Sequence, residues 1–122
     1  MATSPDYDAL ARTWYDCWNR HDLNAIMALY ADDIRFTSPY VRTLGFAENG
    51  TLDSKADVRR YFETGLSRIP NLHFEPVANC VGADGHVLIY KNQAESWVAE
   101  SHDYNEQALI VRATAAYTGS PA

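Results

Sequence analysis

The chain has 122 residues, a length typical of one domain that buries its own core. Hydrophobic residues make up 47% and charged residues 21% of it, and the net charge is −6. No basic cluster is larger than the pair Arg59–Arg60, so we do not expect nucleic acid as a partner. No window of 18 apolar residues occurs, so we do not expect a membrane span either. The first residues lack the pattern of a signal peptide, and Cys17 and Cys80 match no metal or redox spacing. We therefore expect a cytoplasmic protein with reduced thiols.

Two helices are predicted at the start of the chain. Ser4 can cap the first helix and Pro5 suits its first position, and apolar residues then recur at helical spacing as far as Trp18. The letters NRHD break this helix. Asp22 can cap a short second helix that includes residues 23–30.

A strand and a third helix follow. Residues 33–38, DIRFTS, alternate between apolar and polar side chains, which predicts a strand that Pro39 stops. Residues 40–52 show no sustained period and are predicted as a loop with room for a short strand. Ser54 can cap the third helix, which Pro70 ends.

The remainder of the chain reads as strands. Four strand-like runs occupy residues 72–81, 86–92, 96–104 and 108–117. Asp84-Gly85 is a hairpin signal, and the short connections predict an antiparallel meander. The order of elements predicts a single α+β domain over residues 1–122, with a cone-shaped, curved antiparallel sheet packed against three helices. The concave end of such a cone can hold a ligand.

Three segments carry a resemblance to a known family. WNRHDLNAIMALYADDIRFTSP, SKADVRRYFETGL and NEQALIVRATAAY resemble the nuclear transport factor two-like superfamily, in its SnoaL-like and ketosteroid isomerase-like branch. The likeness spans roughly Asp8 to Tyr117 and implies a cystatin-like roll made of one SnoaL-like domain. The superfamily contains isomerases, cyclases, hydrolases, dehydratases and non-enzymatic binders, so the resemblance assigns no single activity.

The resemblance also implies that most of the usual catalytic groups have been exchanged. Ser38 stands where the isomerase pattern has its base carboxylate, and Trp14 stands where it has an oxyanion tyrosine. The acid of the SnoaL type would fall at Ala115 or Ala116. Glu100 matches the position of the oxyanion-hole carboxylic acid.

One strand joins an acid to an imidazole. Val98, Glu100, His102 and Tyr104 share one face of the run 96–104, because side chains alternate along a strand. Side chains two residues apart lie about 6.5–7 Å apart, so Glu100 and His102 can address one ligand. A carboxylate and an imidazole in an apolar cavity suit general acid–base catalysis. The alternative places both on a solvated face or at a dimer contact.

The predicted site consists of Glu100 and His102 as catalytic residues and a larger substrate-binding set. That set is Trp14, Trp18, Tyr30, Phe36, Ser38, Tyr40, Phe62, Val98, Ala113 and Ala115. Trp14 and Trp18 also fit an ordinary core, and the two alanines also fit close helix–sheet packing. No spacing predicts a metal site, no cofactor is expected, and His86 is predicted to be exposed.

Two functional hypotheses remain open. The first is a cofactor-independent isomerase, cyclase, dehydratase or hydrolase that acts on an apolar small molecule by acid–base chemistry. The second is a ligand-binding or dimerisation module without catalysis, and a protein-partner adaptor is a third reading that no motif supports. The family resemblance and the apolar letters VLIY and ALIV favour a homodimer through the outer face of the sheet.

Overall fold

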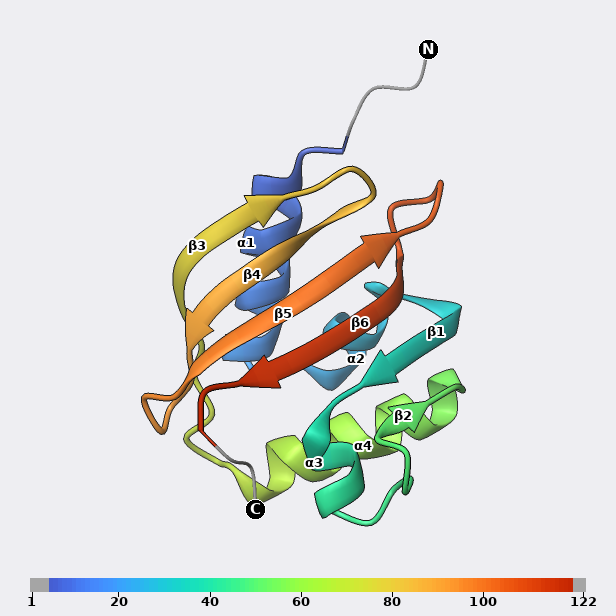
Figure 1. The fold of residues 1–122 in the computed structure, drawn as a ribbon, viewed down its shortest axis with the longest axis vertical. Helices are drawn as coiled ribbons and strands as arrows, with labels where there is room; N and C mark the ends of the chain where they lie inside the picture. Colours follow the sequence, from blue (N-terminus) through green and yellow to red (C-terminus); the bar gives the residue numbers. More distant parts are fainter. Residues whose placement is uncertain (1–4, 120–122) are drawn as a thin grey trace.

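The computed structural model describes residues 5–119 (Figure 1). Its helices are α1 (Tyr7–Asn19), α2 (Leu23–Met27), α3 (Pro39–Thr43) and α4 (Lys55–Arg68). Its strands are β1 (Tyr30–Thr37), β2 (Thr51–Leu52), β3 (Glu75–Val81), β4 (Gly85–Lys91), β5 (Trp97–Tyr104) and β6 (Ile110–Tyr117). The predicted α+β class is confirmed. Among the described helices, none is long and apolar enough to cross a membrane. The cytoplasmic location stays a prediction.

The first helix begins two residues later than predicted. Asp6, not Ser4, is the cap: its carboxylate accepts a hydrogen bond from the Ala9 N–H at 3.0 Å, and the helix starts at Tyr7. Pro5 therefore lies before the helix, and Ser4 lies outside the described residues. An aspartate at this place satisfies a free N–H of the first turn and adds a negative charge near the positive end of the helix dipole.

The second helix is shorter than predicted because Tyr30 belongs to the first strand. Asp22 caps α2 as expected, and the helix ends at Met27. Tyr30 instead begins β1, where it pairs with Ile110 of β6. Its hydroxyl accepts a hydrogen bond from the Trp14 indole N–H at 3.0 Å. Pairing and burial of this tyrosine override the helical pattern of the residues before it.

The segment predicted as a loop contains a helix. Ser38 adopts an extended backbone and accepts a hydrogen bond from the Tyr40 N–H at 3.3 Å, so it caps α3. Pro39 occupies the first helical position, where its missing N–H is not needed. The proline that stops β1 thus also starts a helix. The short strand allowed for in this segment is β2, which pairs with β1.

The sheet has six strands in the order β2-β1-β6-β5-β4-β3. Strands β3 to β6 form the predicted antiparallel meander. The pairing of β1 with β6 is parallel, so the sheet is mixed and not wholly antiparallel. Figure 1 shows the arrows of β1 and β6 side by side and pointing the same way. The chain between them holds α3, β2, α4 and the other three strands, a connection long enough for a parallel pair.

Helices cover one face of this sheet and leave the other open. Figure 1 shows α1 behind the meander and α4 across the lower end of the fold. On β5, Val98, Glu100 and His102 are buried against the helices, whereas Trp97 is 43% exposed on the opposite face. The predicted inward direction of the even-numbered side chains of β5 is confirmed.

Candidate functional site

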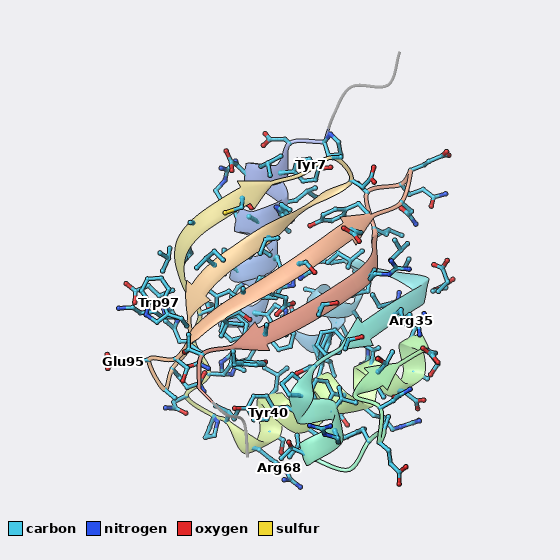
Figure 2. All side chains as sticks on the ribbon, viewed as in Figure 1. Tyr7, Arg35, Tyr40, Arg68, Glu95 and Trp97 are labelled. Carbon is cyan, nitrogen blue, oxygen red and sulfur yellow. The ribbon has the colours of Figure 1, made fainter. Side chains whose placement is uncertain are left out.

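A cavity of about 370 Å³ lies between the inner face of the sheet and helices α1 and α4. Six of the predicted substrate-binding residues line it: Trp14, Trp18, Phe36, Tyr40, Phe62 and Val98. Its buried part is mostly aromatic, because α1 contributes two indoles and β4 and β5 face them with Tyr90 and Val98. Its more exposed part is formed by α4, α3 and the turn between β4 and β5, near the labelled residues Tyr40, Arg68 and Glu95 in Figure 2. Such a space suits a small apolar molecule.

Glu100 is the one carboxylate that the described residues place on the cavity lining. Its side chain is buried, and both carboxylate oxygens have a partner. Oε1 accepts a hydrogen bond from the Tyr90 hydroxyl at 2.9 Å, and Oε2 lies 2.7 Å from Nε2 of His102. A carboxylate has about four lone-pair sites, so these bonds orient Glu100 and still leave it able to accept a proton from a ligand.

His102 lies behind Glu100 and does not line the cavity. The imidazole is completely buried, and the Trp14 ring lies 5.0 Å away between centroids. Its Nδ1 has no partner among the described residues. With the proton on Nε2, the ring donates to Glu100 and leaves Nδ1 as an unpaired acceptor, not an unpaired donor. The histidine can thus position the carboxylate, but it cannot touch a ligand in the cavity.

Tyrosines surround the Glu100 carboxylate. Burial, reinforced by the negative charge of Glu100, raises the pKa of Tyr15, Tyr90 and Tyr117 above the usual value. Burial also raises the pKa of Tyr61 to about 12. These phenols therefore keep their protons at neutral pH, and those on the lining can donate hydrogen bonds but cannot act as bases.

Four residues of the predicted substrate-binding set lie off the lining. Tyr30 is fully buried and its hydroxyl is bonded to Trp14, while the Ser38 hydroxyl is turned toward the backbone of α3. Ala115 pairs across the strands with Glu100, and Ala113 pairs with His102. None of these four residues is part of the cavity lining formed by residues 5–119, and their contact with a ligand stays a prediction.

Several lining residues were missed by the sequence reasoning. Tyr90 alternates with Leu88 on β4 and faces Val98 in register, a period-two signal that was available. Tyr117 lies on β6 two residues after Ala115, hence on the same face of that strand, but was not included in the predicted site. Gly65 and Arg68 of α4 lie outside its apolar stripe, and the turn between β4 and β5 carries no recognisable motif. The latter positions depend on how the elements pack.

His86 is buried, not exposed as predicted. It faces His102 in register across β4 and β5, with the ring centroids 5.8 Å apart. Its Nε2 lies 2.7 Å from the Tyr104 hydroxyl. Burial, with a smaller contribution from the neighbouring His102, lowers the pKa of His86 to about 4. Even with this second histidine, residues 5–119 include no group of three or more His, Cys, Asp or Glu side chains placed to hold a metal.

Solved structures from several bacteria are similar to this chain in fold. A SnoaL-like protein of unknown function from Burkholderia thailandensis is 33% identical, with 93% of this chain and 94% of that chain covered and a TM-score of 0.88. A candidate isomerase of the SnoaL-like family from Agrobacterium tumefaciens is 11% identical, with 93% and 97% covered and a TM-score of 0.72. A candidate polyketide cyclase from Sinorhizobium meliloti is 14% identical, with 93% and 95% covered and the same TM-score. The last two likenesses show the fold alone.

The remaining comparisons settle the family. Matching structures include proteins described as nuclear transport factor two-like and as cystatin-like in fold, which confirms the architecture implied by the resemblance. No curated protein matches the chain. The profile of the SnoaL-like domain matches residues 11–119. With this match over most of its length, the chain belongs to the SnoaL-like domain family.

Proposed function

We propose that this protein binds an apolar small molecule in the cavity and that Glu100 transfers protons to and from it without a cofactor. The observation that carries the proposal is the placement of a single carboxylate, buried and hydrogen-bonded, on an aromatic wall. Isomerisation and aldol-type cyclisation suit this arrangement best, and dehydration and hydrolysis use the same acid–base chemistry. The SnoaL-like fold is shared with a candidate isomerase and a candidate polyketide cyclase, which supports these reaction classes.

The proposed chemistry begins with a carbon acid. Glu100 removes a proton from the carbon beside a ligand carbonyl; the C–H electron pair moves into the new C=C bond, and the carbonyl oxygen takes the negative charge. In an isomerisation, Glu100 returns the proton to a different carbon. In a cyclisation, the enolate carbon attacks a second carbonyl and Glu100 protonates the resulting alkoxide. Tyr61 and Tyr117 line the same cavity and retain the protons with which a phenol can stabilise an oxyanion.

His102 acts in this proposal as a positioning residue. It fixes one carboxylate oxygen by a 2.7 Å contact from a place that a ligand does not reach. The hydroxyl of Tyr90 fixes the other oxygen, so the carboxylate has one orientation toward the cavity. Loss of the histidine should lower turnover more than ligand affinity.

The test is turnover of a panel of apolar ketones, epoxides and aromatic polyketide-like compounds. Glu100→Gln removes the base while keeping the shape, and Glu63→Gln makes the same charge change on an exposed part of α4. Turnover abolished in Glu100→Gln and unchanged in Glu63→Gln is the expected result. His102→Gln keeps an N–H donor and should retain more activity than His102→Ala, with the loss in kcat. Turnover that survives Glu100→Gln would discard the proposed chemistry.

The second candidate function is ligand binding without catalysis. One observation and one implication of the resemblance favour it: Ser38, at the position of the isomerase base, serves as a helix cap, and the SnoaL-type acid would fall at Ala115 or Ala116, neither of which can transfer a proton. A panel compound that binds with a measurable Kd and is recovered unchanged would support this function. The two candidates therefore separate on product formation by the same protein and the same ligands.

We also propose a homodimer that is formed through the open face of the sheet. This face bears the half-buried Val87 and Ile89 of β4 and the exposed Trp97 of β5, and Figure 1 shows no helix across it. A second copy of the same chain would cover this apolar surface symmetrically. Light scattering should then give twice the 13.7 kDa mass of one chain. Introducing a charge with Trp97→Glu should shift the mass toward the monomer, and a monomeric wild-type protein would refute the interface.

A further inference from the structure

The charged groups of the cavity stand at opposite ends. Glu100 is at the buried end, and Arg68, an exposed residue, is at the open end. We propose that the ligand is amphipathic, with an apolar ring body in the aromatic part of the cavity and an anionic head that pairs with Arg68. The inference rests on the proposed function, because it names the chemical class of the molecule that the cavity takes.

Arg68 is the one cation that the described residues contribute to the lining. Arg20, Arg35, Lys55 and Arg60 each have a carboxylate within ion-pair distance. Arg68 forms neither an ion pair nor a side-chain hydrogen bond with any of residues 5–119. An arginine in the last turn of a helix also interacts favourably with the helix dipole, but this interaction leaves its five N–H donors free. Its fork of donors matches the two oxygens of a carboxylate or sulfonate.

The position of Glu100 decides which end of a ligand can be charged. An anionic group placed in the buried part would meet a carboxylate in surroundings of low dielectric constant, where like charges repel strongly. The same group at the mouth meets Arg68 and remains partly hydrated. The whole chain carries a net charge of −6, and Arg68 places a positive charge at the mouth of the cavity.

The turn between β4 and β5 supplies polar groups beside Arg68. Asn92 holds this turn together, since its side-chain oxygen accepts hydrogen bonds from the Ala94 N–H at 3.0 Å and the Ser96 N–H at 3.1 Å. Gln93 also lines the cavity, and its side-chain oxygen is buried without a partner among the described residues. Rotation of the amide exchanges its oxygen and NH₂, so Gln93 can donate a hydrogen bond to an anionic head.

Two fluorescent probes with the same aromatic body test this inference. The first, 8-anilinonaphthalene-1-sulfonate, is an anion, and N-phenyl-1-naphthylamine is its neutral counterpart. Arg68→Gln should weaken the sulfonate probe about five- to tenfold, the effect of losing one partly hydrated charge pair, and change the neutral probe less than about twofold. Arg12→Gln changes the net charge equally at an exposed site on α1 away from the cavity and should affect neither probe. Arg68→Lys should keep most of the preference for the sulfonate.

The outcomes separate this inference from the function on which it rests. If Arg68→Gln changes both probes equally or neither of them, the anionic head is refuted and the apolar cavity stands. If the wild-type protein binds neither probe, the proposed ligand binding fails and the inference fails with it. Should Arg68→Gln not fold, the salt dependence of the wild-type protein decides. The affinity for the sulfonate must fall between about 50 and about 300 mM salt, over which the screening length shortens about 2.4-fold, while the affinity for the neutral probe is unchanged.

Discussion

Gly65 allows stability and ligand access to be changed separately. It lies inside α4, yet it also lines the cavity, and a Cβ built at this position meets no heavy atom within 4 Å. A glycine inside a helix costs about 0.5–1 kcal/mol relative to alanine, because the unfolded chain has more freedom to lose. Gly65→Ala should therefore raise the free energy of unfolding by about 0.5–1 kcal/mol and Tm by about 2–6 °C.

A larger side chain at the same position should close the mouth. Gly65→Leu keeps good helix propensity and places its branched end in the space that the glycine leaves open. We expect the free energy of unfolding to be at least as high as that of the wild-type protein. The affinity for either naphthalene probe should fall about tenfold. Ser67→Leu is the matched control, since it changes an exposed residue of α4 that does not line the cavity. It should leave probe binding unchanged.

Urea unfolding and probe titration on the same protein samples measure both effects. A loss of stability in Gly65→Ala would refute the open space at this position. Unchanged probe binding in a folded Gly65→Leu protein would refute the cavity as the place where the probes bind. The first result concerns the space around Gly65, and the second concerns the place where the probes bind, so the two measurements are independent.

Three further predictions concern buried polar groups. The pKa of His86 is about 4 in the folded protein and about 6.5 in an unfolded chain, so the unfolded state takes up a proton first as the pH falls. The wild-type protein should therefore lose up to about 3 kcal/mol of stability between pH 6.5 and 4 from this group. In urea unfolding, His86→Gln should flatten the dependence of the free energy of unfolding on pH. Trp14→Phe removes the donor to the Tyr30 hydroxyl and should cost about 1–3 kcal/mol by the same assay, whereas an unchanged midpoint would show that this hydrogen bond is not needed. Tyr90→Phe removes one of the two bonds that hold Glu100 and should lower kcat with little change in KM, while an equal change in both would contradict a positioning role.

The sequence was sufficient where one local pattern determines the structure. The period of two in the run 96–104 correctly predicts that Val98, Glu100 and His102 face inward, because a strand with one buried face has only one such register. The caps at Asp22 and Ser54 were also recognisable, since a short polar side chain before an apolar helical stripe is a local signal.

It was insufficient where packing between distant elements decides. Nothing near His102 in the sequence indicates that its ring packs against Trp14, or that Glu100 lines the cavity and His102 does not. Arg68 reads as an ordinary residue of a helix end, because its place at the mouth depends on the distance from α4 to the turn between β4 and β5. Tyr30 fits the helical pattern of its neighbours, and only its pairing with β6 assigns it to a strand.

The last strand of the chain occupies an interior place in the sheet, between β1 and β5. During synthesis on the ribosome, β1 emerges long before β6. Until β6 is made, the two-residue β2 is the one strand among residues 5–119 that can pair with β1. Assembly of the sheet therefore has to wait for residues 110–117, and a product that stops before Ile110 would have no strand to join β1 to β5.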